Sequence, residues 1–178
     1  MDNIKNVKIS LMLKSRAPFS AFVETARKRV VIFKQQRNIF IIKDLFAITV
    51  FKKPNKKYHL NVTGIKSPKL VPNVIKWIFD TYCSEDTFEF ICFIIDNIAA
   101  SFNLGYSVSL SDLVLQLTPS KYSPERFHAV YFKTDKDTAV IFSSGKINIV
   151  GAKSEVGVMS LWQTLQPTIS AVQEPQAS

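Results

Sequence analysis

The chain has 178 residues, 47% of them hydrophobic and 14 of them phenylalanine, so it is apolar enough to bury a core, which argues against an intrinsically disordered chain. Lysine and arginine number 23 against 14 acidic residues, and the net charge of +9 suggests either a polyanionic partner, nucleic acid before membrane, or simply a basic soluble domain. Charges interrupt the longest apolar stretches, which excludes a membrane-spanning helix, and no signal peptide is evident.

The first half of the chain reads as a strand, a helix, a set of strands and a second helix. Alternating apolar residues and an excess of β-branched and aromatic side chains indicate the strands, and apolar residues at helical spacing indicate the helices. In chain order, the predicted elements are a strand over 4–12, a helix that Pro18 begins, antiparallel strands over 38–43, 46–51 and 58–63, and a helix that Ser67 and Pro68 open.

The second half repeats this order. Its predicted elements are a strand over 88–102, a short helix over 109–117 capped by Ser109 or Ser111, strands over 126–133, 138–142 and 146–150, and a closing helix that Ser154 begins. Proline cannot continue a helix, so Pro167 is expected to stop the last one. A polar, flexible tail over 168–178 is expected to follow it.

The two halves also match at particular residues, which indicates a duplicated domain. An asparagine followed by a hydrophobic residue opens each half, at Asn6 and Asn97, and a strand that ends in phenylalanine follows at Phe51 and Phe142. Both pairs are offset by 91 residues. A repeat of this length rules out a solenoid of small repeats.

The predicted repeats, over 1–87 and 88–167, would each form an antiparallel sheet flanked by helices. Two such sheets could join edge to edge, with all of the helices on one face. The other face would then be a long surface open to solvent. Such a surface is either a binding site or an aggregation hazard, so its residues matter more for function than the core.

Three strings in the second half point to a known family. They are IFSSGKINIVGAKSE over 141–155, SPERFHAV upstream of it, and NIAASFNLG before that. Together they resemble the conserved core of the TATA-box-binding protein family, which the first half resembles through Asn6, Phe51 and residues 63–67. The resemblance implies an α+β fold, a saddle of two pseudo-symmetric repeats. Its single curved antiparallel sheet would face the DNA minor groove, and its helices would lie on the convex face.

The resemblance also implies how DNA is contacted. In the family, each repeat inserts two phenylalanine wedges between base steps and reads bases with one asparagine. Phe127 and Phe142 match the wedges of the second repeat, and Asn97 matches its asparagine. In the first repeat, Phe51 matches one wedge and Asn6 matches the asparagine.

The first repeat departs from this pattern at its second wedge. The matching position falls near Gln36 or Arg37, and neither side chain is apolar. Phe33 and Phe40 are the candidate substitutes. One kink in the DNA is therefore expected to be weaker or to be built differently.

The floor of the groove-facing surface departs as well. Four positions at which the family has valine are occupied by Lys8, Asn61, Ala99 and Asn148. Valine cannot accept a hydrogen bond from the guanine amino group, the feature that distinguishes G·C from A·T in the minor groove, whereas asparagine can. We therefore expect the preference for an A·T-rich TATA element to be relaxed or altered.

The expected contacts extend to the phosphates, whose neutralisation makes binding sensitive to salt. Phosphate-contacting positions of the family are matched by Lys133, Ser144 and Lys146, with Lys8, Lys53 and His59 as candidates in the first repeat. The whole DNA-binding set that the resemblance implies is Asn6, Lys8, Phe51, Asn61, Thr63, Asn97, Ala99, Phe127, Phe142, Ser144, Lys146, Asn148 and Val150.

The implied function is a transcription initiation factor that binds and bends double-stranded promoter DNA and nucleates a preinitiation complex, in the nucleus or at a viral transcription site. Its partners would be transcription factor IIB-like and IIA-like factors or lineage-specific equivalents, with a homodimer when DNA is absent; no cofactor and no membrane are expected. Glu125 is kept at the turn that holds factor IIB in the family, but Arg126 stands where an apolar residue is usual.

Two other function classes remain open. A protein-interaction scaffold with the same fold but without DNA bending is favoured by the lost wedge and the lost valine floor. The net charge, both asparagines and the intact wedges of the second repeat oppose it. An enzyme is the weakest candidate, because the two histidines, Cys83, Cys92 and unpaired carboxylates form no nucleophile, base or metal constellation. We interpret both cysteines as reduced core thiols of an intracellular protein.

Overall fold

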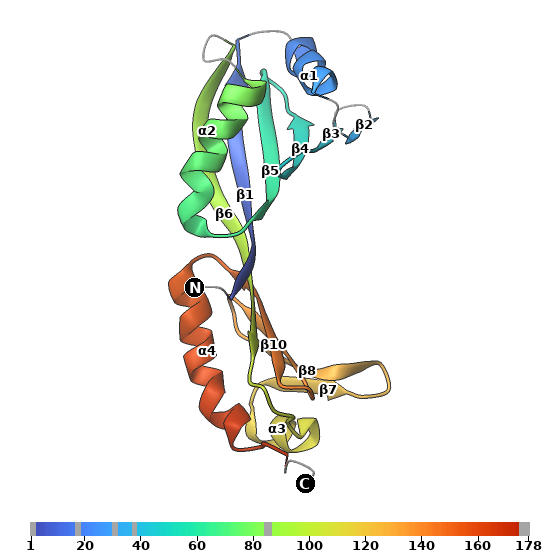
Figure 1. The fold of residues 1–178 in the computed structure, drawn as a ribbon, viewed down its shortest axis with the longest axis vertical. Coiled ribbons are helices and arrows are strands. Elements are labelled where there is room, and N and C mark those ends of the chain that lie inside the picture. The colour runs from blue at the N-terminus through green and yellow to red at the C-terminus, as the bar shows by residue number, and fades with distance from the viewer. Residues whose placement is uncertain (1–2, 17–18, 30–31, 37–38, 84–86, 175–178) are drawn as a thin grey trace. The chain divides into compact units, whose positions relative to one another are not determined.

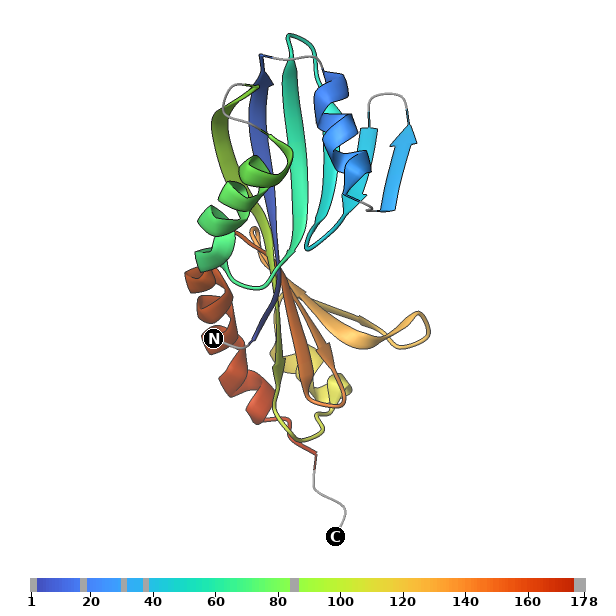
Figure 2. The same ribbon diagram turned by 45° about the horizontal axis from the view of Figure 1, so that its top comes forward.

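The computed structural model describes residues 3–16, 19–29, 32–36, 39–83 and 87–174 of the chain. The chain divides into two compact units. The N-terminal unit comprises Asn6–Asp96, and the C-terminal unit comprises Asn97–Ser178 together with Met1–Lys5. Each unit is an antiparallel sheet with helices packed against it (Figures 1 and 2).

In the N-terminal unit, hydrogen bonds join the strands in the order β2-β3-β4-β5-β1-β6. The strands are β1 (Ile4–Ser15), β2 (Ile32–Gln36), β3 (Ile39–Lys43), β4 (Ala47–Lys52), β5 (Lys57–Ile65) and the first part of β6 (Phe88–Asn103). The helices are α1 (Phe19–Lys28) and α2 (Val71–Tyr82), and a short 3-10 turn, η1 (Pro68–Leu70), leads into α2.

In the C-terminal unit, hydrogen bonds join the strands in the order β6-β10-β9-β8-β7. Its own strands are β7 (Ser120–Ser123), β8 (Phe127–Lys133), β9 (Thr138–Phe142) and β10 (Lys146–Ala152). Its helices are α3 (Leu110–Gln116) and α4 (Glu155–Ser170). The order of elements in the two units is therefore the same, as the sequence repeat predicts.

Strand alternation gives each unit a buried face and an open face. On β1, Val7, Ile9 and Leu11 are fully buried, and on β10, Ile147 and Ile149 are fully buried. The residues between them point to the other side of the sheet, because successive side chains on a strand alternate. The apolar stripes of the helices cover the buried face, which leaves the open face available for contacts with other molecules.

Two serines cap the helices of the C-terminal unit. The hydroxyl of Ser109 accepts a hydrogen bond from the N–H of Asp112, and the hydroxyl of Ser154 accepts one from the N–H of Gly157. Both bonds satisfy backbone donors that have no partner within the helix. Of the two predicted alternatives, Ser109 is thus the cap and Ser111 lies inside α3, while Ser154 caps the helix that it was predicted to begin.

The end of the chain differs from the prediction. α4 continues past Pro167, because the apolar residues beyond it are buried, with Ile169 fully buried and Val172 only 6% exposed. This burial outweighs the hydrogen bond that proline removes from a helix. The expected stop at Pro167 is wrong, and the tail over 168–178 is ordered as far as residue 174; the rest of it lies outside the described residues.

Two edge strands, β2 and β7, were not predicted from the sequence. Both are short and largely polar, so the usual strand pattern is weak in them. The compact units also divide inside β6, after residue 96, whereas the predicted repeats divide before this strand, at residue 87. β6 runs on without interruption across the point where the units divide.

Candidate nucleic-acid interface

Two phenylalanines lie together on the open face of the C-terminal unit. Phe127 begins β8 and Phe142 ends β9, and their ring centroids are 6.0 Å apart in an edge-to-face arrangement. Phe127 is 43% exposed, and the ring of Tyr131 lies 5.5 Å from it. Aromatic rings that stay in water forgo the stabilisation that burial would give, so an exposed cluster of them marks a contact surface.

In the N-terminal unit, Phe51 of β4 lies directly opposite Ile39 of β3, which is 37% exposed. Ile39 is therefore the apolar neighbour that Phe51 has on the open face. The next residue, Phe40, is only 3% exposed in the core, so its assignment as a substitute wedge is wrong. The side chains of Phe33, Gln36 and Arg37 lie outside the described residues. Sequence reasoning missed Ile39, because its place opposite Phe51 depends on the register between β3 and β4.

Asn6 and Asn97 make the same contact in the two units. The Oδ1 atom of Asn6 accepts a hydrogen bond from the N–H of Gly64 at 2.7 Å, and that of Asn97 accepts one from the N–H of Gly151 at 2.6 Å. Both glycines have positive φ angles, 98° and 101°, which glycine adopts without strain. Because each amide oxygen is used by the backbone, the side-chain NH₂ group is the part that remains to donate outward.

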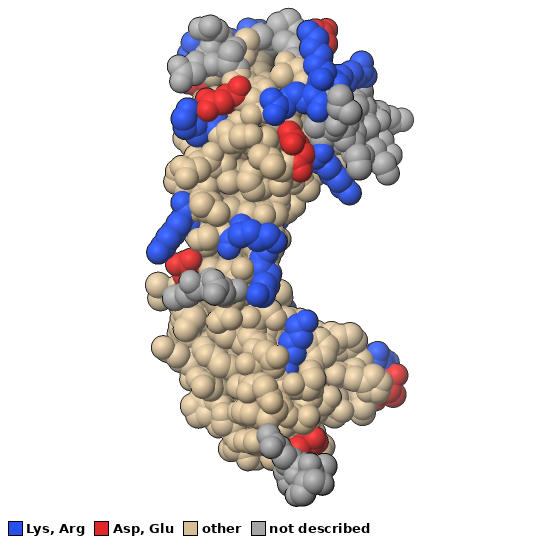
Figure 3. Space-filling model, in the orientation of Figure 1, with Lys and Arg blue, Asp and Glu red and all other residues tan. Residues whose placement is uncertain are grey.

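The charge of the chain is divided unequally between the units. The N-terminal unit carries 16 lysine and arginine residues against 7 acidic ones, whereas the C-terminal unit carries 7 of each. On the face shown in Figure 3, basic side chains accordingly stand mainly over the N-terminal unit. The whole net charge of +9 thus belongs to one unit.

The predicted phosphate contacts lie at accessible positions. In the C-terminal unit the exposed candidates are Lys133, Ser144 and Lys146. In the N-terminal unit, Lys53 and His59 are both close to the ring of Phe51, with the Lys53 Nζ atom 6.0 Å and the His59 ring centroid 5.9 Å from its centroid. Lys53 and His59 therefore stand next to Phe51 in the N-terminal unit.

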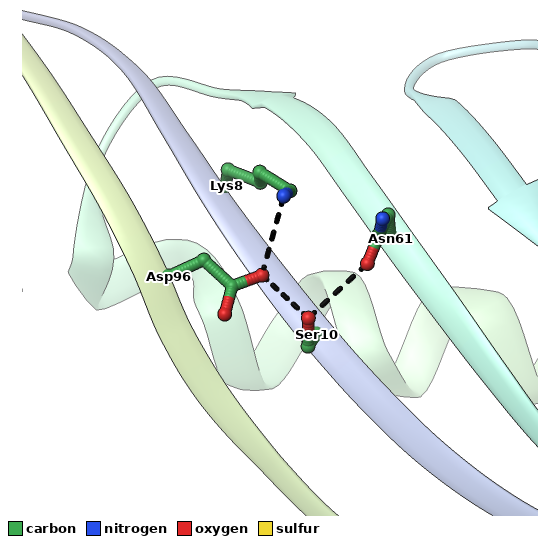
Figure 4. A network of polar contacts seen from close by, with 4 residues as sticks. All are labelled: Lys8, Ser10, Asn61 and Asp96. Carbon is green, nitrogen blue, oxygen red and sulfur yellow. Dashed lines mark hydrogen bonds and ion pairs between the residues drawn. The ribbon is translucent and has the colours of Figure 1, made fainter. Parts of the chain in front are cut away.

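Polar side chains from three strands meet on the open face of the N-terminal unit (Figure 4). The Oγ atom of Ser10 on β1 lies 3.1 Å from Oδ1 of Asn61 on β5 and 2.5 Å from Oδ2 of Asp96 on β6. The Nζ atom of Lys8 lies 3.6 Å from the same carboxylate oxygen. Two predicted floor residues, Lys8 and Asn61, thus join two residues that sequence reasoning missed. Ser10 could have been found, because it lies two residues from Lys8 on one strand.

The floor of the C-terminal unit is built on the same pairing. Asn148 of β10 lies opposite Ser101 of β6, just as Asn61 lies opposite Ser10. The other predicted positions on the open face are partly accessible, namely Thr63, Ala99 and Val150. The predicted partner-binding residues, Glu125 and Arg126, are exposed in the turn between β7 and β8.

The cysteines and helices bear on the other function classes. Cys83 is buried, and burial raises the pKa of its thiol to about 12, while Cys92 is half-buried. Within the described residues, no three histidine, cysteine, aspartate or glutamate side chains are grouped to hold a metal ion. Among the helices of that part of the chain, none has the length and apolar character to cross a membrane.

Comparison with known proteins gives one consistent result. A family model described as transcription factor TFIID, or TATA-binding protein, matches residues 92–172. The TATA-box-binding protein of Methanocaldococcus jannaschii is 32% identical over 121 residues, 65% of each chain. That of Artemia franciscana is 42% identical over 64 residues, 35% of this chain and 23% of the relative. The matches therefore span less than two thirds of these relatives.

A solved structure described as Methanococcus jannaschii TBP aligns with a TM-score of 0.74 at 24% identity, over 96% of this chain and 98% of that one. The match covers both units, whereas the family model covers only the second half of the sequence. The predicted α+β fold class is confirmed by this comparison.

Proposed function

This chain belongs to the TATA-binding protein family, whose members are not enzymes, and from that premise we propose that it binds the minor groove of promoter DNA, bends it and nucleates a transcription preinitiation complex. The observation that carries the proposal is the ring pair on the open face of the C-terminal unit, formed by Phe127, which is 43% exposed, and Phe142, which is half-buried. Apolar side chains that insert between base steps unstack them and bend the duplex.

The asparagines supply hydrogen-bond donors beside these wedges. With their oxygens bound to Gly64 and Gly151, Asn6 and Asn97 present NH₂ groups. Adenine N3 and thymine O2 are the acceptors that every A·T pair shows in the minor groove. An NH₂ donor can therefore bind an A·T pair in either orientation.

We further propose that the preference for a TATA element is relaxed or altered. The floor positions Lys8, Asn61, Ala99 and Asn148 offer polar or small groups in place of a valine surface. Each mismatched base pair normally costs about 1–3 kcal/mol, and polar floor residues that accept the guanine amino group would reduce that penalty. In the N-terminal unit, Ile39 beside Phe51 provides a second apolar group, so that this unit could also kink DNA.

The proposed partners follow the family. They are promoter DNA and factors of the IIB and IIA type, or lineage-specific equivalents, acting in the nucleus or at a viral transcription site. The exposed turn that carries Glu125 and Arg126 is the proposed contact for a IIB-like factor, altered by the added positive charge. A homodimer that covers the open face is the proposed state without DNA.

The test measures bending and affinity together. Fluorescence energy transfer across a short duplex, with TATA, G·C-substituted and random sequences over a series of salt concentrations, reports both. Strong bending with weak sequence preference supports the proposal. Absence of bending, with weak binding that salt abolishes, contradicts it.

The second candidate is a protein-interaction scaffold that keeps the fold. It is favoured by the exposed apolar residues of β6, which include Phe90 and Ile94 at 45% and 61% exposed. A scaffold would leave DNA straight in the same experiment and would not respond to the loss of Phe127 or Phe142.

A further inference from the structure

The network on the open face of the N-terminal unit has one consistent hydrogen-bonding pattern. Its geometry places the Ser10 hydroxyl within reach of both Asn61 and Asp96, with Lys8 beside the carboxylate (Figure 4). A hydroxyl group carries a single proton, so it donates to one of these neighbours and must accept from the other. The question is which neighbour receives the proton.

The charge of Asp96 decides this. A carboxylate paired with a lysine accepts hydrogen bonds and has none to donate, and a bond to a charged acceptor is stronger than one to an amide oxygen. Ser10 therefore donates to Asp96. Asn61 must then donate to Ser10 from its NH₂ group, which a half-turn of the amide about its last bond brings into place. That half-turn directs the Asn61 oxygen away from Ser10.

We propose that Lys8, Asp96 and Ser10 hold Asn61 with its amide oxygen presented on the open face, where it reads the 2-amino group of guanine. This inference rests on the proposed function, in which the open face lies in the minor groove. Asn61 shares that face because its neighbours on β5, Leu60 and Val62, are buried. The guanine amino group is the hydrogen-bond donor that distinguishes G·C pairs there.

Asn61 and Asn6 are thus complementary readers. Asn6 gives its oxygen to Gly64 and keeps its NH₂ group for acceptors on the bases. Asn61 gives its NH₂ group to Ser10 and keeps its oxygen for a donor on the bases. One unit therefore combines a reader of A·T pairs with a reader of G·C pairs.

The C-terminal unit lacks the orienting carboxylate. The 91-residue offset between the repeats places Lys5 at the position that corresponds to Asp96, and Ala99 at the position that corresponds to Lys8. Ser101 and Asn148 are paired as Ser10 and Asn61 are, but a lysine cannot accept the serine proton. The preference for a guanine amino group should therefore be confined to the half of the site under the N-terminal unit.

The test changes only the amino group. The full chain is bound by fluorescence anisotropy, at one salt concentration, to duplexes in which a single G·C pair is moved along the site and then replaced by inosine·C, which lacks the 2-amino group. In a second comparison, an A·T pair is replaced by 2,6-diaminopurine·T, which adds the 2-amino group. In one half of the site, we expect each amino-bearing duplex to bind about 2- to 10-fold more tightly than its partner, the value of one hydrogen bond.

Four variants separate the reading of bases from folding. Asn61→Val should remove the amino preference. Ser10→Ala should reduce it, and Ser10→Thr, which keeps the hydroxyl, should retain it. Ser101→Ala is the matched control, because it removes the equivalent serine of the other repeat and should not alter the preference. Thermal unfolding followed by circular dichroism shows that each variant is folded.

The outcomes are distinct. Equal binding of amino-bearing and amino-lacking duplexes by a chain that still bends DNA would overturn this inference and leave the proposed function standing. Binding to none of the duplexes would overturn both. A preference that survives Ser10→Ala would show that Ser10 and Asp96 do not position Asn61.

Discussion

The side-chain oxygen of Asn97 accepts a hydrogen bond from the backbone N–H of Gly151 at 2.6 Å, across two strands of the C-terminal unit. Gly151 has a φ of 101°, and its N–H would otherwise need a partner at this irregular point of the β6–β10 pairing. Asn97 thus satisfies the backbone with its oxygen, and its side-chain nitrogen remains available to donate.

These two roles of Asn97 can be separated by Asn97→Asp. Aspartate keeps an oxygen for the Gly151 N–H but replaces the NH₂ donors by a second oxygen. We expect the melting temperature to be unchanged and the affinity for DNA to fall at least about tenfold, or 1.4 kcal/mol. Asn97→Ala, the comparison variant, should lose both stability and affinity. Equal losses of stability in the two variants would show that the NH₂ group has a structural role.

Removal of the aromatic pair should abolish bending. Phe127→Ala with Phe142→Ala takes away the apolar groups that would insert between base steps, so energy transfer across the duplex should return to the value of free DNA. The control is Phe90→Ala, because Phe90 is 45% exposed, much as Phe127 is at 43%, but lies against Phe79 of α2. A bend that persists in the double variant would show that Phe127 and Phe142 do not cause it.

Gly145 is required for the turn that joins β9 and β10. A Cβ atom on Gly145 would lie 2.0 Å from the backbone oxygen of Tyr106, and its φ is 75°. Gly105 also has a positive φ, 80°, but no atom lies within 4 Å of its Cβ position. We expect Gly105→Ala to cost about 1–2 kcal/mol and Gly145→Ala distinctly more, as measured by urea unfolding. Similar losses of stability in the two variants would mean that the backbone around Gly145 shifts easily to make room for the added Cβ atom.

Stability should fall at alkaline pH because of Cys83. The pKa of this thiol is raised from 9.0 to about 12 by burial, so the folded chain holds the proton that the unfolded chain releases. The contribution of the Cys83 thiol to the free energy of unfolding is therefore complete below pH 9. Above that pH it declines, by at most about 1.4 kcal/mol per pH unit. Urea unfolding at pH 7, 9 and 10 should show a smaller decline for Cys83→Ala than for Cys92→Ala. An identical decline in the two variants would show that the Cys83 thiol is not the cause.

The regular elements were predictable because each carries its own pattern. Strands such as β1 and β9 alternate buried and accessible residues, and the capping serines stand directly before their helices. The course of α4 beyond Pro167 was not predictable, since it depends on the burial of Ile169 and Val172 among residues distant in sequence. Local propensity gives way to packing there.

The candidate site was predictable only in part. Phe127, Phe142 and the asparagines were found because the strings around them resemble a known family. Ile39 and Asp96 were missed, because their roles arise from cross-strand neighbours, Phe51 for the first and Ser10 for the second. Register between strands is set by the whole sheet, and a single strand does not display it.

The unequal division of charge between the units has a kinetic consequence. Long-range attraction between basic groups and phosphates accelerates the encounter with DNA, whereas close contacts made after docking slow its dissociation. The N-terminal unit, which holds all of the net charge, would govern how fast the chain arrives on a duplex. The C-terminal unit, with its ring pair on the open face, would govern how long it stays, so ionic strength and aromatic substitutions would act on different rate constants.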